Sequence, residues 1–136
     1  MAVFLDTNVL LYAAMAEDSA SEKRSRARLL LRRNDCVLSV QVLQEFFVQA
    51  TRKSRPDRLS DELAMALVAT WRRFEVVENG LPVLDRAFGI RMKYRFSFWD
   101  CMIVAAALES GCERLFTEDL SSGQRIEGLI IENPFA

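Results

Sequence analysis

The chain has 136 residues, of which 51% are hydrophobic and 27% are charged. This composition is typical of one soluble globular domain and excludes a disordered or fibrous chain. The absence of histidine excludes Ser-His-Asp and Cys-His catalysis and acid–base chemistry by a histidine pair. The net charge of −1 conceals an asymmetry: residues 1–95 hold 16 basic and 12 acidic side chains, a balance of +4, and residues 96–136 hold 2 and 7, a balance of −5.

Short apolar runs alternate with helical patterns, and no linker or repeat divides the chain, so we expect residues 1–136 to form one domain. The predicted strands are 2–5, 36–40, 75–78, 114–117 and 129–132. The predicted helices are 7–16, 21–33, 42–52, 60–74, 82–95 and 98–109. Because the strands are apolar throughout, they predict a buried parallel sheet, and hence a three-layer α/β/α fold with five parallel strands.

Polar residues at the helix starts are candidate caps, because their side chains can accept hydrogen bonds from the first free N–H groups. The candidates are Thr7 or Asn8, Ser19 or Ser21, and Ser97. The helix predicted over residues 98–109 is apolar nearly all round and should therefore lie deep in the core.

Cysteine usage and hydropathy indicate the compartment. The three cysteines, Cys36, Cys101 and Cys112, include no Cys-x-x-Cys pair, so we expect buried, reduced thiols and not disulfides or zinc ligands. The longest uncharged stretches are about ten residues, whereas a membrane span needs about 18. We therefore expect a cytoplasmic protein that does not enter a membrane.

Four acidic residues follow strands or begin helices in a way that places them at one edge of the sheet. Asp6 follows the first strand and Asp119 the fourth, while Glu45 and Asp100 lie in the early turns of helices. Ligands of open α/β sheets bind at the carboxyl ends of the strands. Carboxylates flanked by apolar residues must pair, raise their pKa or bind a cation, and clustered carboxylates suit Mg²⁺ or Mn²⁺.

Each acid also has a purely structural interpretation. Asp6 could be a helix cap, Asp119 a turn residue and Glu45 a half-exposed helix residue. Asp100 lies where the helix dipole favours an acid whatever its function. Glu118 competes with Asp119 for the fourth acidic position. Taken singly these signals are weak, and it is their shared location that indicates a site.

The local sequences around the four acids carry a family resemblance. They are Val-Phe-Leu-Asp6-Thr7-Asn8, Val42-Leu43-Gln44-Glu45-Phe46, Ser97-Phe98-Trp99-Asp100-Cys101 and Leu115-Phe116-Thr117-Glu118-Asp119. In this order, and over essentially the whole chain, they resemble the acidic motifs of PIN-domain nucleases, and specifically of VapC-type toxins from bacterial type II toxin–antitoxin pairs. The last motif lies in a short, irregular region and is the least distinct.

The resemblance implies an endoribonuclease that uses Mg²⁺ or Mn²⁺ to cleave structured RNA such as tRNA or rRNA. It also implies a cognate antitoxin and a homodimer. On this interpretation Asp6, Asp100 and Asp119 hold the metal, and Glu45 completes the catalytic set. A metal-activated water would then attack the phosphate. Donors that orient the carboxylates are expected from Thr7, Asn8 and Thr117, whose alternative roles are capping and turn formation.

RNA needs a basic surface beside an acidic site. Residues 21–58 hold 10 basic and 4 acidic side chains. The preferred phosphate contacts are Arg52, Lys53, Arg55 and Arg58. A second set, Arg24, Arg28 and Arg32, shares one face of its predicted helix. For both sets a solvated surface is the alternative, and for the aromatic residues Phe47, Phe98 and Trp99 we expect core packing, with base stacking as the alternative.

Two other functions stay open at this stage. One is a PIN-like module that binds RNA or protein without cutting, which the presence of all four acids disfavours. The other is a phosphohydrolase that uses Asp6 as its nucleophile. That chemistry calls for a second Asp two residues later, a position that Asn8 occupies.

Overall fold

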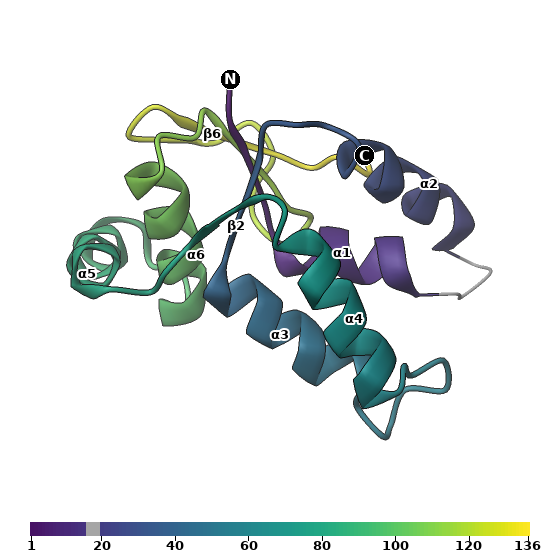
Figure 1. The fold of residues 1–136 in the computed structure, drawn as a ribbon. Coiled ribbons are helices and arrows are strands. Elements are labelled where there is room, and N and C mark those ends of the chain that lie inside the picture. The colour runs from purple at the N-terminus through teal and green to yellow at the C-terminus, as the bar shows by residue number, and fades with distance from the viewer. Residues whose placement is uncertain (16–19) are drawn as a thin grey trace.

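The computed structural model describes residues 1–15 and 20–136 (Figure 1). Its strands are β1 (Val3–Leu5), β2 (Cys36–Ser39), β3 (Glu75–Val77), β4 (Arg114–Phe116), β5 (Arg125–Ile126) and β6 (Leu129–Glu132). Its helices are α1 (Thr7–Ala14), α2 (Ser21–Leu30), α3 (Val40–Ala50), α4 (Asp61–Trp71), α5 (Leu81–Tyr94) and α6 (Phe98–Glu109). The predicted helix end at Ala16 and the cap candidate Ser19 lie outside the described residues.

In the described ranges the strands form one sheet in the order β3-β2-β1-β4-β6-β5. The five predicted strands are all present and run parallel to one another. The sequence missed β5, which pairs antiparallel with β6. Two residues are too few to show a pattern, and the turn lies at Glu127 and Gly128, both with positive φ, of which only Gly128 favours that conformation from sequence.

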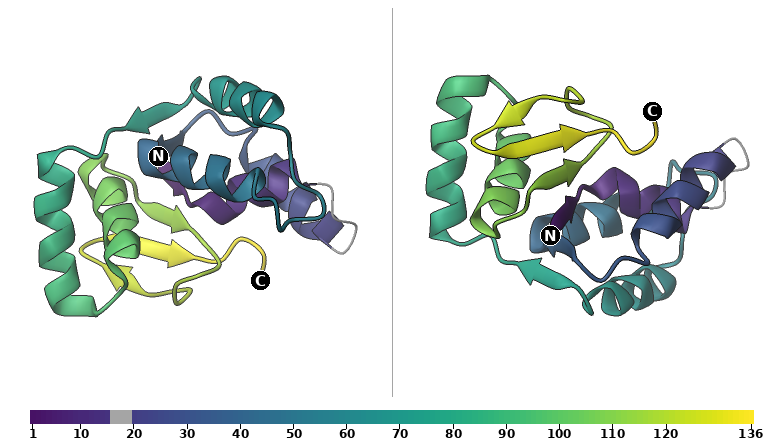
Figure 2. Two further views of the ribbon diagram at one scale, coloured as in Figure 1. Left: turned by 90° about the horizontal axis from the view of Figure 1, so that it is seen from below. Right: turned by 90° about the horizontal axis from the view of Figure 1, so that it is seen from above.

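The strand order places helices on both faces of the sheet. β2 and β3 lie on one side of β1, whereas β4, β6 and β5 lie on the other. Because parallel crossovers are right-handed, the helices between β1 and β3 and those between β3 and β4 cover opposite faces. Figure 2 shows α5 and α6 side by side at one end of the molecule and α1 and α2 at the other. The predicted three-layer α/β fold is confirmed.

Helix α6 lies in the core, as its apolar sequence predicts. Its residues 101–107 are all buried, and it packs against β2 and β4. The Ser97 side chain caps it by accepting a hydrogen bond from Asp100 N at 3.1 Å. The three cysteines are buried free thiols, as predicted. None of the helices in the described part of the chain is long and apolar enough to cross a membrane.

Other helix starts differ from the predictions because a different residue provides the cap. Asp6, which the sequence also allowed as a helix cap, is the N-cap of α1 in place of Thr7 or Asn8. Ser21 is the first residue of α2 and not its cap. Helix α3 begins two residues earlier than predicted, since Ser39 accepts a hydrogen bond from Val42 N at 3.2 Å.

Candidate functional site

The four predicted acids line one pocket of about 360 Å³. Asp6 joins β1 to α1, Asp119 follows β4, Glu45 lies on α3, and Asp100 lies in the first turn of α6. β1 and β4 are parallel neighbours, so the residues that follow them meet at one edge of the sheet. The structure therefore brings together, from four elements, side chains that are up to 113 positions apart in sequence.

Asp6 is the most buried of the four, with 5% of its surface exposed. One carboxylate oxygen accepts a hydrogen bond from Thr7 N at 2.7 Å, and the other accepts from Thr117 Oγ1 at 2.8 Å. Burial raises the pKa of Asp6 to about 6, and the charges of Asp119 and Glu45 act in the same direction, against the two hydrogen bonds. Ionised Asp6 is therefore energetically unfavourable in this site, and a bound cation would stabilise it.

Thr117 is the centre of the hydrogen-bond network. Its hydroxyl donates to Asp6 and accepts from Asn8 Nδ2 at 3.2 Å and from Asp119 N at 3.1 Å. Asn8 Nδ2 also donates to Asp119 Oδ2 at 3.1 Å. The amide and hydroxyl therefore hold Asp6 and Asp119 in fixed relation across β1 and β4, as expected for residues that orient metal-binding carboxylates.

Glu45 is held by two neutral donors. Thr7 Oγ1 donates to its Oε2 at 3.0 Å, and Gln41 Nε2 donates to its Oε1 at 2.7 Å. Gln41 also donates to the Trp99 carbonyl at 3.1 Å and so ties α3 to the start of α6. Sequence analysis did not single out Gln41. The available signal was its position one helical turn before Glu45, a spacing at which side chains meet.

Asp100 is half-buried, and burial is the main cause that raises its pKa, with the charges of Asp119 and Glu45 adding to it. A hydrogen bond with Ser97 opposes the rise. The acids thus influence one another across the pocket, although each comes from a different element. Mutual repulsion of this kind is a feature of sites that bind cations or share a proton.

Glu118 lines the same pocket as these four acids but differs from them in its partners. It accepts hydrogen bonds from Tyr12 Oη at 2.7 Å and from Lys23 Nζ at 3.1 Å, the latter an ion pair. Lys23 Nζ also donates to Tyr12 Oη at 3.2 Å. The sequence alone left Glu118 and Asp119 as alternatives for the fourth acidic position. In the structure Glu118 is half-buried and its charge is paired with Lys23, whereas Asp119 joins the network of Asn8 and Thr117.

The donor chemistry of the pocket fits a divalent cation. In the described part of the chain, no ion pair involves Asp6, Glu45, Asp100 or Asp119. All their ligand atoms are carboxylate oxygens, which hard cations such as Mg²⁺ and Mn²⁺ prefer. Among the described residues no three acidic side chains are close enough together to hold an ion as they stand. Mg²⁺ usually keeps several waters and is bound through one or two carboxylates together with substrate phosphates, so it does not require three acids in direct contact.

The predicted phosphate contacts reach the site to different degrees. They lie in the loop between α3 and α4, where Arg55 lines the acidic pocket itself. Arg52 lines an adjoining pocket with Glu45. Lys53 is exposed on the same loop, and Arg58 lines a separate pocket near the start of α4. Only Arg55 and Arg52 are therefore brought beside the acids.

The arginines of α2 have an unforeseen structural role. Arg28 Nε donates to the Ala13 carbonyl at 2.9 Å, and one terminal guanidinium nitrogen of Arg24 donates to the Met15 carbonyl at 3.2 Å. The last carbonyls of a helix lack partners within the helix, and these side chains satisfy them at the end of α1. Arg28 is nonetheless exposed, so this role comes in addition to the solvated face or RNA contact considered from the sequence.

Of the three aromatic residues expected in the core, Trp99 departs from the expectation. Phe47 and Phe98 are partly buried and pack against the core. Trp99 has 61% of its surface exposed and contacts the edge of Phe98, with ring centroids 5.1 Å apart. Trp99 lies in the first turn of α6, before the buried run over residues 101–107, which accounts for its exposure.

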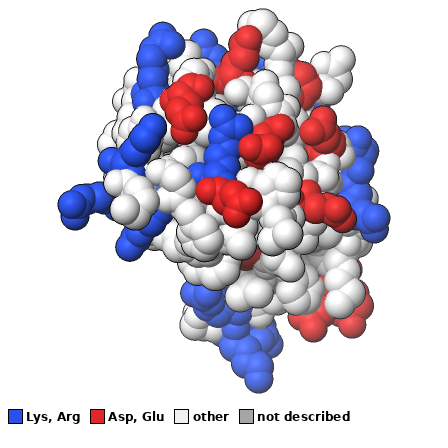
Figure 3. Space-filling model, turned by 90° about the vertical axis from the view of Figure 1, so that its left-hand side faces the viewer, with Lys and Arg blue, Asp and Glu red and all other residues white. Residues whose placement is uncertain are grey.

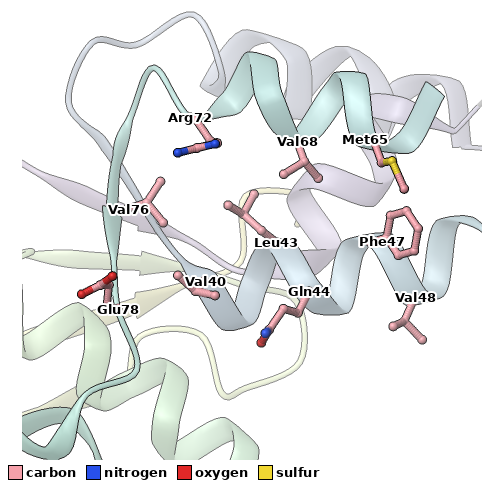
Figure 4. A pocket seen from close by; sticks show the side chains of 10 residues that line it. All are labelled: Val40, Leu43, Gln44, Phe47, Val48, Met65, Val68, Arg72, Val76 and Glu78. Atoms are coloured by element: carbon pink, nitrogen blue, oxygen red, sulfur yellow. The ribbon is translucent and has the colours of Figure 1, made fainter. Parts of the chain in front are cut away.

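The largest pocket described is not the acidic one. It is a groove of about 740 Å³ between α3 and α4, lined mainly by apolar side chains such as Leu43, Phe47, Met65 and Val68 (Figure 4). None of the four acids lines it. The pocket that can support hydrolytic chemistry is therefore the smaller, polar one.

The face over α5 and α6 presents charges of both signs. Figure 3 shows acidic and basic side chains interleaved across the middle of this face. Ion pairs of Arg86 with Glu109 and Glu127 join α5, α6 and the turn between β5 and β6. Such a mixed surface lacks the continuous positive charge that favours nucleic acid, so the α3–α4 loop is the better candidate for an RNA path.

The fold and the acidic pocket together define a PIN-type α/β protein. The model of the PIN domain family matches residues 3–122, and the chain belongs to this family. Nucleases of the family generally use divalent metals. A search of curated proteins finds no match.

Solved structures with the same fold include toxins and toxin–antitoxin complexes. VapC20 of Mycobacterium tuberculosis, described as a toxin that cleaves the sarcin–ricin loop, is 18% identical with a TM-score of 0.67, covering 87% of this chain and 92% of its own. A toxin–antitoxin complex from Klebsiella pneumoniae is 22% identical, with a TM-score of 0.67 and 98% of both chains covered. FitAcB from Neisseria gonorrhoeae is 16% identical, with a TM-score of 0.71 and 98% of both chains covered.

Proposed function

We propose that residues 1–136 act as one PIN nuclease domain, a Mg²⁺- or Mn²⁺-dependent endoribonuclease that serves as the toxin of a toxin–antitoxin pair. The observation that carries the proposal is the set of four carboxylates from four elements in one pocket, none of them in an ion pair within the described residues. Membership of the PIN family and the toxin neighbours support it.

Asp6, Asp100 and Asp119 would hold the cation, and Glu45 would complete the cluster. When bound, a cation of this class supplies an activated water and neutralises charge that develops on the phosphate. Thr117 and the backbone N–H of Thr7 fix both oxygens of Asp6. This fixed orientation is the protein's own contribution, since carboxylates that are already in place need little reorganisation during the reaction.

The remaining polar residues extend this arrangement. Thr7 and Gln41 orient the two oxygens of Glu45, and Asn8 orients Asp119. Arg55 lines the same pocket and is half-exposed. Its guanidinium lies 3.6 Å from the Asp57 carboxylate, so a phosphate at the mouth would share or replace this partner. Structured RNA, such as tRNA or rRNA, is the proposed substrate class.

The proposed partner is a cognate antitoxin, and the proposed assembly includes a homodimer of this chain. Homologues have been crystallised in toxin–antitoxin complexes. We propose that a short apolar helix of the antitoxin docks beside the pocket and that one of its basic side chains enters the acidic cluster. Co-expression with the adjacent reading frame should then restore growth and yield a stable complex.

The test of the nuclease is cleavage of total RNA with Mn²⁺ and with EDTA, using two neighbouring acids as a matched pair. Asp119→Asn should abolish cutting, whereas Glu118→Gln should retain most of it, because Lys23 already pairs with Glu118. RNA binding without cutting by the wild-type chain would favour a binding module. A trapped phospho-aspartate at Asp6 would favour a phosphohydrolase.

A further inference from the structure

A second pocket, of about 480 Å³, adjoins the acidic pocket. Glu45 and Gln49 line both pockets, so a ligand could occupy the two continuously. Its other lining residues are Gln41, Gln44, Val48, Arg52 and Trp99. Gln44 and Val48 also line the apolar groove (Figure 4), so the second pocket and the groove share these two residues.

Trp99 gives the second pocket an exposed aromatic surface. Its side chain is exposed, whereas the other tryptophan, Trp71, has only 4% of its surface exposed. The Trp99 carbonyl accepts a hydrogen bond from Gln41, the same residue that holds Glu45. The backbone of Trp99 is therefore tied, through the buried Gln41 side chain, to an acid of the candidate catalytic set.

The polar side chains around the indole complement a nucleotide. Gln44 and Gln49 carry amides that can both donate and accept hydrogen bonds, as the edge of a base requires. Arg52 is exposed and takes part in no ion pair within residues 1–15 and 20–136, which leaves its guanidinium able to bind a phosphate. Aromatic stacking, amide contacts and a cation are the combination by which proteins bind unpaired nucleotides.

We propose that this pocket binds one unpaired nucleobase of the RNA, next to the phosphate at the acidic site. The base stacks on Trp99, and Arg52 contacts an adjoining phosphate. The inference rests on the proposed nuclease function and adds to it that the substrate must present a single-stranded or flipped-out nucleotide beside the cut. The Gln44, Gln49 and Arg52 side chains favour RNA over an apolar protein segment as the occupant.

The experiment measures binding of a single-stranded RNA oligonucleotide in the Asp100→Asn background, which is chosen to prevent cutting. Trp99→Ala should weaken binding about 5- to 150-fold, the range that stacking contributes, and Trp99→Phe should recover most of it. Phe88→Ala removes another exposed ring, from α5, and should leave binding unchanged. RNA should quench the fluorescence of Trp99, and this quenching should disappear in Trp99→Phe, where only the buried Trp71 remains.

An oligonucleotide series with one abasic position identifies the stacked base. RNA that lacks the stacked base should bind weakly to the Asp100→Asn protein. Adding Trp99→Ala should then cause no further loss of affinity for this abasic RNA. Equal RNA affinity of the Asp100→Asn protein with and without Trp99→Ala overturns the inference. A changed oligomeric state on adding Trp99→Ala would instead assign Trp99 to a contact between copies of the chain. If otherwise wild-type protein cuts RNA while Trp99→Ala has the same KM, only the base pocket is refuted. If the protein with the wild-type Trp99 and Asp100 neither binds nor cuts RNA, the nuclease proposal fails as well.

Discussion

Replacing Thr117 with valine should reveal how much of the site's stability depends on one hydroxyl. Thr117 is fully buried, and valine has nearly the same shape, so Thr117→Val removes hydrogen bonds without leaving a cavity. The hydroxyl donates to Asp6 and accepts from Asn8 and from the backbone of Asp119. The largest loss falls on Asp6, because its Oδ2 has no other hydrogen-bond donor among the described residues.

The expected cost is about 2–4 kcal/mol in the free energy of unfolding. A hydrogen bond to a charged group contributes about 1.5–3 kcal/mol and a neutral one about 1 kcal/mol. The neutral losses are partly recovered, since Asn8 keeps its bond to Asp119 and water can reach the pocket. For a chain of this size the change corresponds to a fall of about 10 °C in Tm.

The assay is chemical denaturation in EDTA, with Thr70→Val as the matched control. Thr70 lies on the exposed face of α4, where its hydroxyl donates only to the Ala66 carbonyl of the same helix. The deficit of Thr117→Val should grow as the pH rises through about 6, because the lost bond counts most when Asp6 is ionised. A deficit below about 0.5 kcal/mol, or one no larger than that of Thr70→Val, would refute the reasoning.

Three further predictions concern charge, metal and chemistry. In EDTA the free energy of unfolding should fall by up to about 3 kcal/mol between about pH 4 and pH 7. The cause is that burial raises the pKa of Asp6 from 3.8 to about 6, so this carboxyl ionises at a lower pH in the unfolded chain than in the folded one. Asp6→Asn should flatten the pH dependence of the free energy of unfolding, whereas the exposed control Glu113→Gln should not. Asp100→Asn should abolish cleavage, keep the circular dichroism of the fold, and lose the rise in Tm that Mn²⁺ gives the wild type; a wild-type rise would contradict its place at the cation. Cleavage should leave 5′-phosphate and 3′-hydroxyl ends and stop in EDTA, because attack by an activated water needs no ribose 2′-hydroxyl; cyclic 2′,3′-phosphate ends would contradict this mechanism.

The sequence predicted the parts of the fold that local patterns determine. The apolar strands and the helix over residues 98–109 were predicted because burial on both faces removes the usual alternation. The acids Asp6 and Asp119 could be placed at one edge because each directly follows a strand of a parallel sheet. This inference needs the order of the elements only, and it places the residues without any knowledge of their contacts.

The contacts that the sequence could not predict join residues far apart in the chain. Glu118 and Tyr12 are 106 positions apart, and no periodicity reveals which acid a lysine such as Lys23 will pair with. The exposure of Trp99 also depends on where the sheet ends, which hydrophobicity alone does not indicate. The contact of Arg28 was missed for the same reason, since its partner is a backbone carbonyl of another helix.

The partners of the acids separate two kinds of carboxylate at this edge of the sheet. Glu118 is paired with a lysine, which lowers its effective charge and its capacity to bind a cation. Asp6, Asp119 and Glu45 accept hydrogen bonds from neutral groups instead. These donors include Thr117, Asn8 and Gln41. Neutral donors fix the direction of a carboxylate and leave its charge in place, so the pocket keeps both the orientation and the negative potential that binding a divalent cation requires.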